Sequence, residues 1–196
     1  MLASINPLGE RGRNQRYPVT IAAYVVGSTL AGAGLGAVLG FAGSRVATTP
    51  ALGVVAVIAI VGLALDAHAF GLRVPGPRRQ VNENWLTAYR GWVYGSGFGV
   101  QLGLAFLTIV TASATWVTFA CALFAGNAVA GAIVGTMFGF ARALPILSAA
   151  RVRDAGALHA LMRRLERLRP RVAAVTTATQ GVAAAGLVAL LIGRAA

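Results

Sequence analysis

Apolar residues dominate this chain in long runs, separated by short polar stretches rich in arginine, glycine and proline. A run of about 20 apolar residues in an α-helix is long enough to cross the hydrocarbon of a bilayer. We therefore predict an all-α, polytopic membrane helix bundle that forms one integral membrane domain over residues 1–196. The five predicted transmembrane helices cover residues 18–42, 51–72, 92–112, 116–141 and 171–192. The third and fourth are nearly continuous, and we expect a turn between them near residues 112–115.

The segment over residues 152–168 has a different pattern. Apolar residues fall at helical spacing on one face and arginines on the other. The apolar residues are Leu158, Leu161, Met162, Leu165 and Leu168, and the arginines are Arg163, Arg164 and Arg167. This pattern predicts a basic amphipathic helix that lies on the membrane surface. Docking of a partner protein is the alternative.

Composition supports the membrane assignment. Hydrophobic residues make up 57% of the chain and charged residues 11%, whereas soluble domains carry about 25% charged residues. The net charge is +12, and every basic residue apart from the histidines is an arginine. Fifteen of the seventeen arginines lie on one side of the five-helix topology, which leaves only Arg45 and Arg194 on the other.

This asymmetry predicts orientation. The positive-inside rule places the N-terminus in the cytoplasm, in a multi-pass protein of the plasma (bacterial inner) membrane. The same arginines predict contact with anionic lipid on the cytoplasmic side and no role in nucleic-acid binding. The first 16 residues are polar and lack the apolar core of a cleavable signal peptide, so we expect the first helix to be permanent.

Glycines recur at every fourth position in three of the apolar runs. Small residues at this spacing let helix backbones approach closely in lipid, so we expect these stripes to pack helices together. Association of a second copy through one stripe is the alternative. The stripes are Gly32, Gly36 and Gly40; Gly95, Gly99 and Gly103; and Gly131, Gly135 and Gly139.

Two of these stripes share a longer pattern. Residues 32–42 read GAGLGAVLGFA and residues 131–141 read GAIVGTMFGFA. The two helices would run in opposite directions, which is what an inverted-topology repeat predicts. Chance similarity among glycines and alanines is the alternative.

The order of features in the C-terminal half resembles the transmembrane domain of the CcdA/DsbD thiol-disulfide carriers, within the wider group of LysE-like exporters. A glycine-rich helix, GAIVGTMFGFARALPIL, is followed by the basic linker ALHALMRRLERLRPR and the apolar helix VAAVTTATQGVAAAGLVALLIG. In INPLGERGR, Asn6 and Pro7 stand where that family has a proline-cysteine motif. The resemblance implies six helices in two inverted triplets, so the family's first helix would have to lie upstream. Dithiol chemistry needs two sulfurs, and Cys121 is the only cysteine, so we expect a degenerate member without redox activity.

A few polar residues interrupt the apolar runs and are the candidate site residues. They are Asp66, His68, Gln101, Asn127 and Gln180. Ionisable groups at membrane depth are functional candidates by default, and together these side chains predict a polar path. Interhelical hydrogen bonding or a solvated interfacial pair is the alternative. The spacing of histidine, cysteine and carboxylate residues matches no catalytic or metal-binding motif, so we expect no enzyme activity, no metal and no cofactor.

Two functions follow from these observations. The first is a small-solute transporter or exporter of CcdA/LysE-like ancestry, which requires the polar residues to face one cavity. The alternative is a non-catalytic membrane scaffold or assembly subunit of a larger complex, in which those residues pair locally. The partner would then be a membrane complex or a second copy of the chain.

Overall fold

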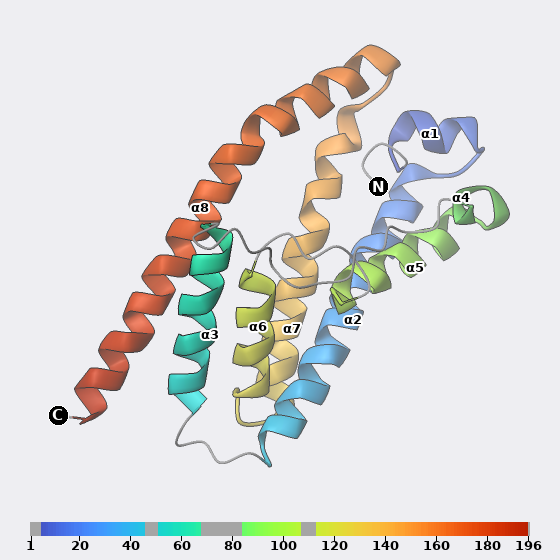
Figure 1. Ribbon diagram of the computed structural model, residues 1–196. Coiled ribbons are helices and arrows are strands. Elements are labelled where there is room, and N and C mark those ends of the chain that lie inside the picture. The colour runs from blue at the N-terminus through green and yellow to red at the C-terminus, as the bar shows by residue number, and fades with distance from the viewer. Residues whose placement is uncertain (1–4, 46–50, 68–83, 107–112, 196) are drawn as a thin grey trace.

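The computed structural model describes residues 5–45, 51–67, 84–106 and 113–195, and the secondary structure in these ranges is helical (Figure 1). The elements are α1 (Pro7–Gly12), α2 (Tyr17–Gly43), α3 (Ala51–Asp66), α4 (Trp85–Ala88), α5 (Gly91–Leu104), α6 (Ala114–Leu123), α7 (Ala128–Ala143), η1 (Leu144–Arg151) and α8 (Ala155–Ala195). Among these described residues, three helical stretches are long and apolar enough to cross a membrane: Tyr17–Gly43, Ala128–Arg151 and Ala155–Gly193. The expectation of a helical fold is confirmed for the described residues, and the three stretches are consistent with a membrane protein.

Helix α2 packs directly against α7, and the two run in opposite directions (Figure 1). The contact is made by the two glycine stripes that share the repeated pattern. A Cβ atom on Gly36 would lie 2.9 Å from the carbonyl carbon of Gly131 and 3.0 Å from the Cα of Gly135. A Cβ on Gly131 would in turn lie 2.9 Å from the Cα of Gly40. The glycines of both helices are therefore needed for the backbones of α2 and α7 to come this close.

Helix α5 packs against α2 in the same way, through the third stripe. A Cβ on Gly95 would lie 2.5 Å from the carbonyl oxygen of Thr20, and one on Gly99 would lie 2.9 Å from the backbone nitrogen of Ser28. The buried Ser28 hydroxyl donates to the carbonyl oxygen of Gly139, at 2.7 Å. Helix α2 thus has backbone contacts with both α5 and α7, and this trio is the centre of the bundle.

The helix predicted over residues 116–141 is divided into two, and that prediction is wrong in its boundaries. Helix α6 ends at Leu123 and α7 starts at Ala128, so the chain turns inside the predicted span. The turn predicted near residues 112–115 lies partly outside the described residues. Gly126 has a positive φ of 83°, a conformation that glycine adopts without strain. Asn127 then caps α7, because its side-chain oxygen accepts a hydrogen bond from the backbone nitrogen of Ala130 at 2.8 Å. These two residues explain the turn locally.

The segments predicted as a surface helix (152–168) and a separate span (171–192) form one helix, α8, of 41 residues. Pro170 lies inside it. Proline removes one backbone hydrogen bond and bends a helix without necessarily ending it. Figure 1 shows α8 as the outermost helix, leaning over toward α7 at its N-terminal end. It packs mainly on α3.

Candidate functional site

A polar cluster joins α3, α6 and α8. Asp66 is the last residue of α3, and its carboxylate oxygens both lie 3.1 Å from the backbone nitrogen of Ser113, which donates to them. The Ser113 hydroxyl also donates to Asp66 Oδ2, at 2.7 Å. Ser113 is buried and immediately precedes α6. The carboxylate therefore accepts two hydrogen bonds at the N-terminus of α6.

Gln180 completes this cluster from α8. Its side chain is 6% exposed. Its Nε2 donates to the Ser113 hydroxyl oxygen at 2.7 Å and to the carbonyl oxygen of Ala59 at 3.3 Å. The Ser113 hydroxyl can thus donate its proton to Asp66 while its oxygen accepts from Gln180, so these contacts are compatible with one another. We call Asp66, Ser113 and Gln180 the Asp66 cluster.

Gly62 gives the cluster its space. A Cβ atom at this position of α3 would lie 2.7 Å from Ser113 Oγ and 2.9 Å from Gln180 Nε2. Both distances are shorter than van der Waals contact allows, so any larger residue would displace the polar side chains. Gly62 and Asp66 are one helical turn apart on α3 and face the same neighbours.

The cluster lies beside the middle of the apolar part of α8. Along α8, at about 1.5 Å per residue, Gln180 is about 13 Å from Arg171 and about 20 Å from Gly193. Its position in the sequence suggests that Asp66 lies close to the inner end of a span, but its contact with Gln180 places it near the middle of the apolar part of α8. A helix that begins at this depth exposes backbone N–H groups where water is absent. A carboxylate at a helix N-terminus satisfies such a group and complements the helix dipole.

The other candidate residues lie elsewhere or outside the described residues. Asn127 caps the N-terminus of α7, where it is exposed. Gln101 is half-buried on α5, and His68 lies outside the described residues. The structure thus brings Asp66 and Gln180 together but does not bring Asn127 to them.

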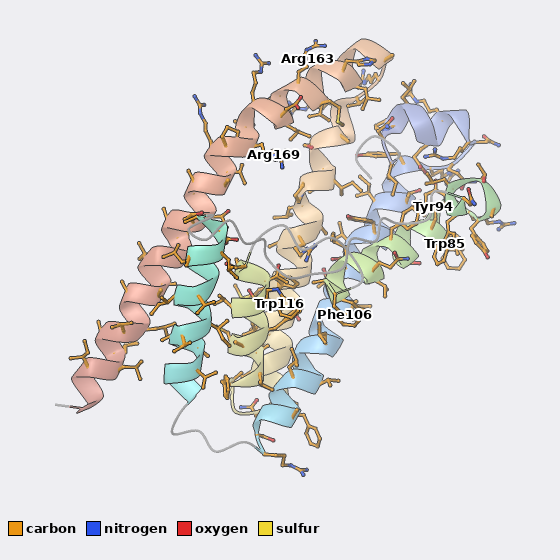
Figure 2. The ribbon with its side chains drawn as sticks, in the orientation of Figure 1. Trp85, Tyr94, Phe106, Trp116, Arg163 and Arg169 are labelled. Atoms are coloured by element: carbon orange, nitrogen blue, oxygen red, sulfur yellow. The ribbon has the colours of Figure 1, made fainter. Side chains whose placement is uncertain are left out.

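A second polar cluster was not predicted. Glu10 of α1 is 0% exposed and accepts hydrogen bonds from three side chains. The donors are Tyr94 Oη at 2.6 and 2.7 Å, Thr20 Oγ1 at 2.7 Å and the Arg13 guanidinium at 2.6 Å. We call these four residues the Glu10 cluster. Burial by itself lowers the pKa of Arg13, but its hydrogen bonds to Glu10 and Tyr94 outweigh burial and raise that pKa. The cluster holds α1 against α2 and α5, and Figure 2 shows Tyr94 near α1 and α4.

A sequence signal for this cluster does exist. Asn6 is the N-cap of α1, since its side-chain oxygen accepts from the backbone nitrogen of Gly9 at 2.9 Å, and Pro7 occupies the first helical position. Asparagine followed by proline is a common helix start. In INPLGERGR this pair is therefore a helix cap, which explains it without a proline-cysteine motif. The helix start in turn places Glu10 where it faces α5.

Two further features bear on chemistry. Among the described residues, no group of three or more histidine, cysteine or carboxylate side chains could hold a metal ion. Cys121 is an exposed residue of α6.

No protein-family model matches this sequence, and no solved structure matches it. The chain is similar to proteins named "Methylamine utilization protein MauF". It is 36% identical over 127 residues to the protein from Paracoccus versutus, which is 63% of this chain and 45% of the relative. It is 33% identical over 131 residues to the one from Paracoccus denitrificans, covering 64% and 45%, and 29% identical over 151 residues to the one from Methylorubrum extorquens, covering 74% and 53%. The chain spans about half the length of the curated relatives it matches.

These relatives overturn two expectations. The resemblance to the CcdA/DsbD and LysE-like group rested on glycine and leucine patterns, which many membrane helices share, and on Asn6 and Pro7, which form a helix cap. The expectation of a small-solute transporter or exporter rested on the predicted inverted repeat and the polar residues at depth, and it is contradicted because the relatives are named for methylamine utilisation, which fits the alternative of an accessory or assembly protein better. By sequence, this chain is similar to proteins named "Methylamine utilization protein MauF".

Proposed function

We propose that this chain is a non-catalytic accessory protein of a methylamine utilisation system, which serves in the membrane as an assembly partner for another protein of that system. The observation that carries the proposal is its similarity to MauF proteins over about two thirds of the chain. The partner is a protein and not a transported solute. We expect no enzyme activity of its own.

The packing of α2 with α5 and α7 supports a structural role. Their glycines bring backbone against backbone, and a Cβ on Gly103 would lie 3.0 Å from the Ala31 side chain and the same distance from the Gly32 nitrogen. As a result, the backbones of α2, α5 and α7 pack directly on one another at the centre of the bundle. A rigid core of this kind suits a scaffold that presents fixed surfaces to a partner.

For the membrane topology, we propose five crossings with the N-terminus in the cytoplasm. Helices α5 and α6 then serve as two halves of one crossing. Helix α5 ends at Leu104, where Ala105 takes a positive φ of 54°, and α6 begins after Ser113. Figure 1 shows the two short helices following one another down the bundle. The Asp66 cluster supplies the acceptor that the second half needs at its start.

Charge supports the same orientation. The arginines of α1, η1 and the first part of α8 lie at one end of the bundle, whereas Arg45 follows the opposite end of α2 (Figure 1). The arginine-rich end is the cytoplasmic one by the positive-inside rule. Anionic lipid on that side is the expected lipid partner.

Growth of the host bacterium tests the function. We expect a strain without this gene to lose growth on methylamine while growing normally on a carbon and nitrogen source that needs no methylamine oxidation. Uptake of labelled methylamine into the cells should be unchanged, because the chain is not the transporter. Normal growth on methylamine, or a loss of uptake that precedes the loss of growth, would contradict the proposal.

A further inference from the structure

Three arginines form a row on α8. Arg163, Arg167 and Arg171 are four residues apart, so they lie one above another on a single helical face, about 6 Å apart along the axis. All three are exposed. We call this row the arginine ladder.

The ladder ends where the apolar part of α8 begins. Arg171 is followed by Val172, the first residue of a run without charge that extends to Gly193. In a membrane-spanning helix this boundary lies at the level of the lipid headgroups. Arg167 and Arg163 are about 6 and 12 Å further along the axis. Because α8 leans over at this end (Figure 1), their height above the hydrocarbon is smaller than these lengths.

The ladder lies on the outermost helix and is available from outside the bundle. Helix α8 packs on α3 and η1, and Figure 2 shows Arg163 at its N-terminal end, pointing away from the other helices. Glu166 is the acidic residue within this part of the helix, against the three ladder arginines and their neighbours Arg164 and Arg169. The local charge is therefore strongly positive on a face that meets the surrounding lipid.

Guanidinium groups suit phosphate in particular. Their planar donors form paired hydrogen bonds with phosphate oxygens, which an ammonium group cannot match. Three such groups in a row at headgroup level offer repeated sites for lipid phosphates. Each basic residue near an anionic membrane surface contributes about a 5-fold gain in binding.

We propose that the arginine ladder is a binding site for anionic phospholipid, which holds the projecting part of α8 against the cytoplasmic leaflet. The site takes the phosphate of a lipid such as phosphatidylglycerol, whose net negative charge distinguishes it from the zwitterionic phosphatidylcholine. A lipid is favoured over an acidic protein because the row is continuous with the membrane boundary at Arg171. This inference does not depend on the role in methylamine utilisation.

The test is lipid binding by the purified full chain in a neutral detergent. Phosphatidylglycerol and phosphatidylcholine are titrated against the native chain, against R163Q and the ladder variant R163Q/R167Q, and against the control R45Q. The control removes one exposed arginine that follows the opposite end of α2. We expect the native chain and the control to prefer phosphatidylglycerol equally, R163Q to bind it about 5-fold more weakly and R163Q/R167Q about 25-fold more weakly.

Three outcomes would overturn the proposal. The first is equal binding of phosphatidylglycerol by the ladder variant and the native chain. The second is displacement of the lipid by inorganic phosphate at the same concentration, which would indicate a site for free phosphate. The third is tighter binding of poly-glutamate than of phosphatidylglycerol, which would indicate an acidic protein. Circular dichroism of each variant verifies that the helices are intact.

Discussion

The Asp66 cluster makes a quantitative prediction about how α3 and α6 are coupled. We consider Asp66→Ala and Ser113→Ala, singly and together. Asp66→Ala removes the acceptor for the Ser113 backbone nitrogen at 3.1 Å and for the Ser113 hydroxyl at 2.7 Å. Ser113→Ala removes only the hydroxyl. The coupling between the two substitutions measures the hydroxyl–carboxylate bond and whatever depends on it.

The single substitutions are less informative than the pair. A hydrogen bond to a charged group contributes about 1.5–3 kcal/mol, so the loss of two costs about 3–6 kcal/mol. Removal of a carboxylate from the bilayer interior returns about 2.5–3.5 kcal/mol. For Asp66→Ala the second effect offsets part of the first, and the net loss of stability lies between about −0.5 and 3.5 kcal/mol. The coupling energy isolates one bond and should be about 1.5–3 kcal/mol.

The assay is reversible unfolding of the purified chain in mixed micelles, followed by circular dichroism as a denaturing detergent is added. The control cycle pairs Asp66→Ala with Thr118→Ala. Thr118 is also on α6, but its hydroxyl donates to the carbonyl oxygen of Ala114 in its own helix, at 2.8 Å. That cycle should show coupling within about 0.5 kcal/mol of zero. If Asp66 and Ser113 couple no more strongly than this control, the carboxylate does not hold α6.

Three further predictions concern other parts of the molecule. Gly36→Ala should destabilise the bundle by about 1–3 kcal/mol, because the added Cβ overlaps the backbone of α7. The control Gly34→Ala, whose Cβ would have nothing within 4 Å, should be neutral or stabilising. Equal effects of the two substitutions on unfolding in detergent would refute the close contact. Glu10→Gln should lower stability by about 2–3 kcal/mol, because hydrogen bonds to a charged carboxylate are lost. The control Glu166→Gln, at an exposed position, should change stability by less than about 0.5 kcal/mol. Thermal unfolding measures both, and equal melting temperatures of the two variants would count against the buried Glu10 cluster. With Cys121 replaced by serine, a cysteine at Ser44 should react with an impermeant maleimide in intact spheroplasts and one at Glu166 only after lysis; the reverse order would invert the proposed topology.

The helical class follows from the sequence because long apolar runs have few stable alternatives in a bilayer. The close contact of α2 and α7 was also foreseeable in kind, since glycine at every fourth position has a direct steric meaning. What pattern alone did not reveal is that the two copies of GAxxGxxxGFA contact each other. An inverted repeat is one origin of that similarity. The contact between the two helices is another, because both helices need glycine at the same spacing for their backbones to meet.

Boundaries within the apolar stretch 92–141 were harder to predict. Both 105–113 and 124–127 are flanked by apolar sequence, and only Gly126 and Asn127 carry a local turn signal. The start of α6 depends on an acceptor from Asp66, 47 residues earlier. A partner supplied by another helix leaves no mark in the local pattern. The same is true of Glu10, whose partner Tyr94 is 84 residues away.

The proposal that this chain is an assembly partner is tested most directly by its purification under mild detergent from cells grown on methylamine, with mass spectrometry of the proteins that accompany it. We predict a stoichiometric partner from the methylamine utilisation system, whose amount in the membrane falls when this gene is deleted and recovers when it is restored. Recovery of the chain alone or only with copies of itself, with every other protein of the system unchanged in the deletion strain, would contradict the account.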